Sequence, residues 1–165
     1  MAEKKINLSE YHPNDIPKAG KWRIAIVISE WNPEITFALR DGAVEMLEQQ
    51  GLPKKDIIIK YAPGSFELPT AAQMMFEADT ELDAVICLGC VIQGETRHFD
   101  FICDAVAHGV MKVSLDYNSP VIFGVLTTNT LEQAQDRAGG KHGNKGVEAA
   151  VACLKMLTLE RSLNK

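Results

Sequence analysis

Residues 83–98 read DAVICLGCVIQGETRH, and this stretch decides the fold. Residues 83–91 are almost entirely apolar, which is typical of a strand that is buried on both faces of a sheet. Gly94 follows shortly, and apolar side chains then recur at helical spacing over residues 97–115. A buried strand that passes through a glycine turn into a helix is the unit of parallel α/β sheets.

The same alternation of strand and helix continues on both sides of this unit. Further strands are expected where apolar residues run together, at residues 22–28, 56–61 and 121–126. A further helix is expected at residues 35–47, where apolar residues recur at helical spacing. Another is expected to begin near Pro69, since proline is favoured in the first turn of a helix. A short helix capped by Thr130 and Gln133 and a last helix capped by Asn144 complete the set. The sequence therefore predicts an α/β fold, a three-layer α-β-α sandwich around a four-stranded, parallel, flavodoxin-like sheet.

Length and composition indicate one soluble domain that spans residues 1–165, with residues 1–20 as an extended leader. The net charge of −5 and the lack of a Lys/Arg cluster argue against nucleic-acid binding. No apolar run approaches the roughly 18 residues that span a bilayer, so no membrane association is expected. Residues 1–5 lack the apolar core of a signal peptide, and a cytoplasmic location is the default expectation.

Cys87 and Cys90 form a C-x-x-C spacing inside the predicted strand at residues 83–91. Residues three apart on a strand point to opposite faces, so these two thiols are not placed to share a metal ion. We expect both to be small buried hydrophobic residues. Because no histidine pair shows a ligand spacing either, no metal site is predicted.

Ligands of parallel α/β sheets bind beyond the carboxyl ends of the strands, which directs attention to residues 94–98. Free backbone N–H groups at the start of the following helix and the positive helix end could bind an anion. The alternative is a plain turn with Thr96 as N-cap. His98 shares the inward-facing side of the helix, where its neutral form would suit a general base; the alternative is a packed core histidine.

Three other segments could contribute to such a site. Residues 62–69 hold Phe66 and Glu67 in a stretch stiffened by prolines, and Trp31 could form a second wall around a flat heterocycle. Taken singly, these side chains could equally be a hydrophobic plug and a helix-start acid. Arg137 offers forked donors for a phosphate, or is a solvated charge.

Phe123 lies near the start of the predicted strand at residues 121–126 and not at its carboxyl end. At about 3.3 Å per residue, its side chain cannot reach the crevice of its own chain. If Phe123 serves a site, that site belongs to a neighbouring subunit.

Four motifs taken together resemble the lumazine synthase family. They are PGSFELP at residues 63–69, LGCVIQGETRHFD at 88–100, PVIFGVLTT at 120–128 and RAGGKHGNKG at 137–146. They occur in the order of the family, and the likeness runs from about Trp22 to the last helix. Any one of these motifs alone would be weak, whereas four in register are highly specific.

The resemblance implies the condensation of 5-amino-6-(D-ribitylamino)uracil with 3,4-dihydroxy-2-butanone 4-phosphate. The product is 6,7-dimethyl-8-ribityllumazine, the precursor of riboflavin, with release of phosphate and water and without a metal or organic cofactor. His98 would be the catalytic residue. The resemblance implies that the ribitylaminouracil is bound by Trp31, Ser65, Phe66, Glu67, Cys90, Val91, Ile92 and, from the adjacent subunit, Phe123. It implies that the butanone phosphate is bound by Glu95, Thr96 and Arg137.

The family also implies a homo-oligomer with active sites between subunits: a pentamer, and in some members an icosahedral shell of pentamers. The implied partners are the two small-molecule substrates and riboflavin synthase. Residues 4–8 could add a strand to a neighbour's sheet. This chain departs from the family at Gln93, a position that is often basic, and at His142, which is often small. Two rival functions stay open, a transferase acting on another phosphorylated sugar and a non-catalytic flavin or lumazine carrier.

Overall fold

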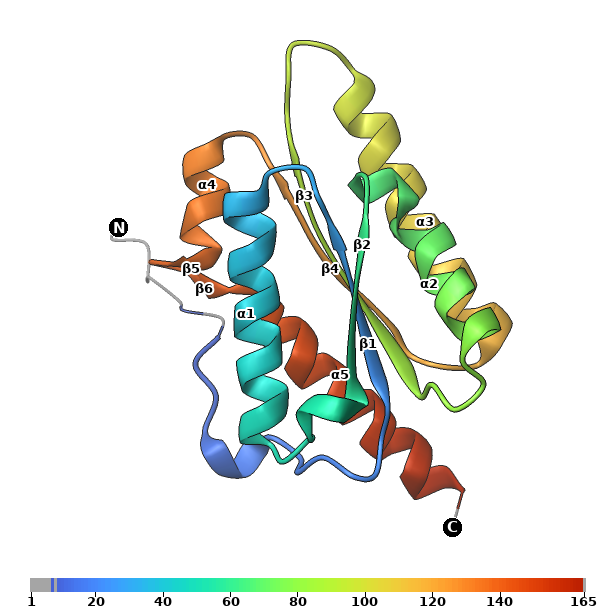
Figure 1. Cartoon of the computed structure of the whole chain (residues 1–165). Coiled ribbons are helices and arrows are strands. Elements are labelled where there is room, and N and C mark those ends of the chain that lie inside the picture. The colour runs from blue at the N-terminus through green and yellow to red at the C-terminus, as the bar shows by residue number, and fades with distance from the viewer. Residues whose placement is uncertain (1–6, 8, 165) are drawn as a thin grey trace.

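A computed structural model describes residues 7 and 9–164. Its centre is a four-stranded parallel sheet with strand order β2-β1-β3-β4, as Figure 1 shows. The strands are β1 (Ile24–Ser29), β2 (Ile57–Ala62), β3 (Ala84–Ile92) and β4 (Val121–Thr128). This is the order of flavodoxin-like sheets, and the predicted fold class is confirmed.

The helices follow the strands as the apolar spacing predicts. They are α1 (Pro33–Gln49), α2 (Leu68–Ala78), α3 (His98–Tyr117), α4 (Leu131–Asp136) and α5 (Lys145–Leu163). Two predicted caps are confirmed. The Thr130 hydroxyl accepts from the Gln133 backbone N–H at 3.2 Å, and the Asn144 side chain accepts from the N–H groups of Gly146 and Val147.

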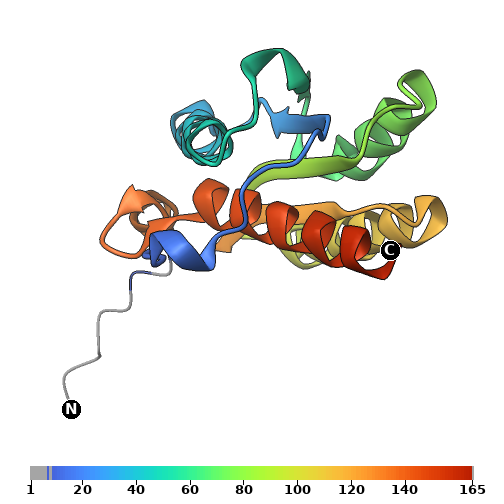
Figure 2. The ribbon, with the colours of Figure 1, turned by 90° about the horizontal axis from the view of Figure 1, so that it is seen from below.

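Each face of the sheet carries its own apolar core. One core packs β-strand side chains such as Ile26 against α1 and α5, and the other packs side chains such as Val27 against α2 and α3. Figure 2 shows α1 and α2 on opposite sides of the sheet. Cys87 belongs to the second core and Cys90 to the first, so the predicted opposite orientation and burial of these thiols are confirmed.

The two helices on the first face approach each other closely at one point. A Cβ atom on Gly146 would lie 1.8 Å from the carbonyl oxygen of Leu39 in α1. Glycine is therefore required at this position, because any side chain would meet backbone. The contact fixes the start of α5, and with it the loop that precedes α5, against α1.

Some short elements were not predicted. Between α4 and α5 the chain forms a small antiparallel hairpin of β5 (Ala138–Gly140) and β6 (Gly143–Asn144). Single 3-10 turns occur at η1 (Pro13–Asp15), η2 (Lys54–Asp56) and η3 (Ser65–Glu67). The predicted strand at residues 4–8 lies outside the described residues except for Asn7. Further along the leader, the Ser9 hydroxyl donates to the Asn144 carbonyl at 3.0 Å.

Candidate functional site

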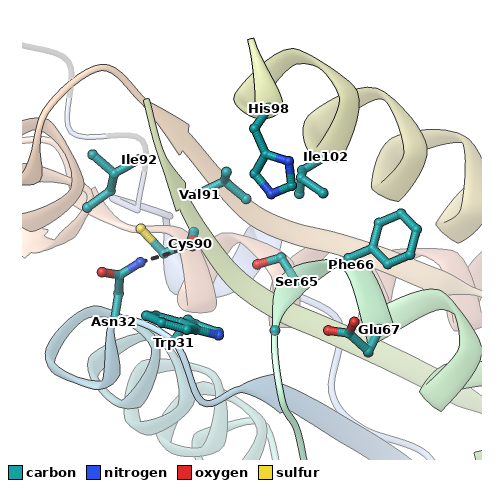
Figure 3. A pocket seen from close by; sticks show the side chains of 11 residues that line it. Trp31, Asn32, Ser65, Phe66, Glu67, Cys90, Val91, Ile92, His98 and Ile102 are labelled. Carbon is teal, nitrogen blue, oxygen red and sulfur yellow. Dashed lines mark hydrogen bonds between the residues drawn. The ribbon is translucent and has the colours of Figure 1, made fainter. Parts of the chain in front are cut away.

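An open cavity of about 600 Å³ lies at the carboxyl ends of β1, β2 and β3, where parallel sheets bind ligands. The loops after β1 and β2, the end of β3 and the start of α3 surround it (Figure 3). The cavity is lined by Trp31, Asn32, Gly64, Ser65, Phe66, Glu67, Cys90, Val91, Ile92, His98 and Ile102. The structure thus brings together eight predicted site residues: Trp31, Ser65, Phe66, Glu67, Cys90, Val91, Ile92 and His98.

The turn between β1 and α1 forms the lower wall in Figure 3. Trp31 is 72% exposed in this chain, which is unusual for so large an apolar side chain. Asn32 follows it in the left-handed backbone region, with φ 56° and ψ 56°, and its Nδ2 donates to the Cys90 carbonyl oxygen at 3.2 Å. This bond ties the Trp31 wall to the end of β3.

The segment after β2 supplies polar groups next to an aromatic ring. A Cβ on Gly64 would lie 3.0 Å from Glu67 Oε2 and 3.3 Å from Trp31 Cδ1, so both side chains pack against this glycine. Ser65 is only 6% exposed, and its hydroxyl has no hydrogen-bond partner within the described residues. Buried hydroxyls are normally paired, so Ser65 Oγ is an unsatisfied polar group at the lining of the cavity. Phe66 is 56% exposed.

His98 begins α3 and lies across the cavity from Trp31, with Ser65 between them (Figure 3). The Thr96 hydroxyl accepts from the His98 backbone N–H at 3.4 Å, but the N-cap of α3 is Arg97, whose side chain makes no capping hydrogen bond, so the alternative of Thr96 as N-cap is wrong. Glu95 and Thr96 are exposed and lie outside the cavity lining. Burial raises the pKa of the Cys90 thiol to about 11, which keeps this cavity residue protonated near neutral pH.

Besides Glu95 and Thr96, two further predicted site residues, Phe123 and Arg137, lie outside the lining of this cavity. Phe123 packs, half-buried, against the core under α2 and α3. Arg137 ends α4 on the α1 side of the sheet, whereas His98 begins α3 on the other side (Figure 1). Neither residue lines the cavity of this chain.

Arg137 is instead part of a cluster of charges at the start of α5. Its Nη1 donates to the His142 carbonyl oxygen at 2.7 Å and lies 2.7 Å from Glu148 Oε1. Lys145 Nζ donates to Glu148 Oε2 at 3.2 Å. The pKa of Tyr11 is raised by burial and then by the charge of Glu148, with Arg137 acting in the opposite direction. The predicted alternative of a solvated arginine is wrong, because Arg137 is mostly buried and paired.

Sequence reasoning missed three residues of the cavity, namely Asn32, Gly64 and Ile102. Asn32 precedes a proline, a position that favours extended backbone, whereas the structure has this residue in the left-handed region, so local sequence does not reveal its bond to β3. Gly64 and Ile102 lie inside segments that were singled out, but their patterns indicate only a turn and a helix face. Across the described residues, no group of three or more His, Cys, Asp and Glu side chains is placed to hold a metal ion. In that same part of the chain, no helix combines the length and apolarity that crossing a bilayer requires.

The fold and the cavity define a flavodoxin-like α/β protein whose ligand pocket combines aromatic walls, a free hydroxyl and an imidazole. A family model described as 6,7-dimethyl-8-ribityllumazine synthase matches residues 21–161. A protein of that name from Cytophaga hutchinsonii is 59% identical, over 92% of this chain and 94% of its own length. Its counterparts from Parabacteroides distasonis and Porphyromonas gingivalis are 50% and 49% identical, over 95% and 98% of this chain and 98% and 99% of their own lengths. The chain belongs to the 6,7-dimethyl-8-ribityllumazine synthase family.

Proposed function

We propose that this protein is a transferase of riboflavin biosynthesis. It condenses 5-amino-6-(D-ribitylamino)uracil with 3,4-dihydroxy-2-butanone 4-phosphate to 6,7-dimethyl-8-ribityllumazine and releases phosphate and water. One observation carries this proposal: the loops after β1 and β2, the end of β3 and the start of α3 converge on one cavity, and most of its lining residues belong to the family motifs. As in the family that the chain resembles, the proposed reaction uses no metal or organic cofactor.

The cavity residues divide between holding the pyrimidine and moving protons. The ring binds against Trp31 and Phe66, and the free Ser65 hydroxyl, Glu67 and the backbone of residues 90–92 bond its polar edge and the ribityl chain. His98 takes the proton from the amine as it adds to the ketone and returns it to the departing water. Because amine and ketone react with each other readily once aligned, orientation supplies much of the acceleration.

The phosphate of the second substrate binds near the start of α3. Backbone N–H groups of Glu95 and Thr96 and the positive end of the helix favour an anion there. Arg137 provides the opposing charge, and Phe123 completes the apolar wall. Since both lie away from the cavity of their own chain, a neighbouring subunit supplies them.

An oligomer with active sites between subunits follows from this arrangement, and we propose a pentamer that assembles further into an icosahedral shell. The strand β2 lies at the sheet edge with Ile59 and Tyr61 exposed, and it offers unpaired backbone to residues 4–8 of a neighbour. The assembly works in the cytoplasm, with riboflavin synthase as its partner.

The test is to mix the purified protein with both substrates and follow lumazine fluorescence. We expect the signal to rise in proportion to enzyme, above the uncatalysed rate, without added metal and in the presence of a chelator. Binding of the pyrimidine without accelerated turnover would refute catalysis and would indicate the carrier alternative. Light scattering on the same sample tests the assembly, and a particle no larger than a pentamer would exclude the shell.

A further inference from the structure

Arg137 is held through both its backbone and its side chain. Its backbone carbonyl accepts from the N–H of Lys145, the first residue of α5, at 2.8 Å. Its Nη1 donates to the His142 carbonyl and lies against Glu148, and the Arg137 and Glu148 side chains are only 19% and 13% exposed. Within the part of the chain that the structure describes, neither Nε nor Nη2 donates a hydrogen bond, so these donors are available for an incoming anion.

Glu148 is shared between two cations. Its Oε1 lies 2.7 Å from Arg137 Nη1, and its Oε2 accepts from Lys145 Nζ at 3.2 Å. One carboxylate against two cations leaves the cluster with a surplus positive charge that an anion can neutralise. Lys145 and Glu148 lie in the first turn of α5, whose start is fixed against α1 through Gly146.

We propose that Glu148 is a positioning residue that orients the Arg137 guanidinium toward the substrate phosphate of a neighbouring subunit. This inference rests on the proposed function, because it takes Arg137 as the phosphate contact. The carboxylate acts on the substrate only through the arginine. An arginine side chain has many rotamers, and fixing it before the ligand arrives removes part of the entropy loss of binding.

The negative charge of Glu148 and its contact with Arg137 have opposite effects on the affinity for phosphate, so two substitutions can separate them. As a charge, the carboxylate repels phosphate, and its removal would tighten phosphate binding. As an anchor, it strengthens phosphate binding by holding Arg137. Glu148→Gln keeps an oxygen against Nη1 and removes the charge, whereas Glu148→Asp keeps the charge and withdraws it by one methylene.

The experiment is calorimetric titration of inorganic phosphate into the intact oligomer of the wild type and of both variants. We expect Glu148→Gln to bind phosphate within about twofold of the wild type and Glu148→Asp to bind it about tenfold more weakly, the loss of a charge-assisted contact. A matched control is Glu48→Gln in α1. Glu48 pairs with Lys54, Oε1 to Nζ 3.6 Å, and has no contact with Arg137 among the described residues. Phosphate binding should not change in this variant.

The opposite order, with tighter binding in Glu148→Gln and unchanged binding in Glu148→Asp, would show a purely electrostatic role and overturn the proposal. Equal binding by all variants would overturn it as well. Steady-state kinetics add a second readout: Glu148→Asp should raise KM for the butanone phosphate and leave KM for the pyrimidine unchanged, whereas a merely structural defect would change neither selectively. Phosphate binding is measured without turnover, so a failure here is distinguishable from a protein that makes no lumazine.

Discussion

Asn32 allows a prediction whose size can be worked out from the structure. Replacing Asn32 by alanine removes the hydrogen bond to the Cys90 carbonyl oxygen. It also places alanine, which lacks a polar side chain, in the left-handed backbone region. We assign about 1 kcal/mol to the backbone and about 1–2 kcal/mol to the lost hydrogen bond. Asn32→Ala should therefore lower the free energy of unfolding by about 2–3 kcal/mol. Asn32→Gly, which tolerates the backbone, should lose only the hydrogen-bond part.

Asn118 provides a matched control, because it is the other described non-glycine residue with positive φ, at 47°. It ends α3 away from the cavity, and its side chain makes no hydrogen bond within the described residues. Asn118→Ala should lower the free energy of unfolding by about 1 kcal/mol, and Asn118→Gly should leave it nearly unchanged.

The assay is urea-induced unfolding at one fixed protomer concentration, because an oligomer's stability depends on concentration. Kinetics complete it: Asn32→Ala and Asn32→Gly should both raise KM for the pyrimidine, since the Trp31 wall is no longer tied to β3. Equal losses in the alanine variants at positions 32 and 118, with unchanged KM, would refute the reasoning.

The remaining predictions concern the site and the helix contact. His98→Ala should slow turnover about 10²-fold without abolishing it, measured as kcat, because orientation persists; complete loss of activity would contradict this. Arg137→Ala should raise KM for the butanone phosphate about tenfold, and an unchanged KM would count against the phosphate role. Gly146→Ala should destabilise the fold by about 3 kcal/mol in urea titrations, because its methyl group would meet the Leu39 carbonyl; wild-type stability would disprove that contact. Alkylation of Cys90 by iodoacetamide should become half-maximal only near pH 11, because burial raises the pKa of this thiol to about 11 and the thiolate is the reactive form. Rapid labelling at pH 8, detected by mass spectrometry, would be inconsistent with it.

The fold was predictable because the two central strands, β1 and β3, are buried on both faces. Continuous apolar runs such as residues 84–92 leave few alternatives, and the opposite faces of Cys87 and Cys90 follow from the two-residue period of a strand. Helix caps at Thr130 and Asn144 were readable because side-chain capping is a local interaction. The first strand begins at Ile24 and not at Trp22, since apolar spacing does not distinguish a strand from buried irregular chain.

The β5–β6 hairpin was missed because strands of two or three residues have no periodicity to detect. The sequence indicated which segments form the site, but it did not indicate the hydrogen bonds and ion pairs between them. The bond from Asn32 to Cys90 and the pair of Arg137 with Glu148 join residues that are distant in sequence, and no local pattern marks them. Glu148 in particular resembles any acidic residue in the first turn of a helix.

The chain has only two tryptophans, and their surroundings differ so much that they form a built-in pair of optical probes. Trp22 is 9% exposed and lies under the guanidinium of Arg161, so its emission should stay blue-shifted until the whole domain unfolds. Trp31, on the rim of the cavity, should emit to the red in the empty protein and lose intensity when a flat heterocycle stacks on it. Occupancy and unfolding can thus be followed in one cuvette without any label.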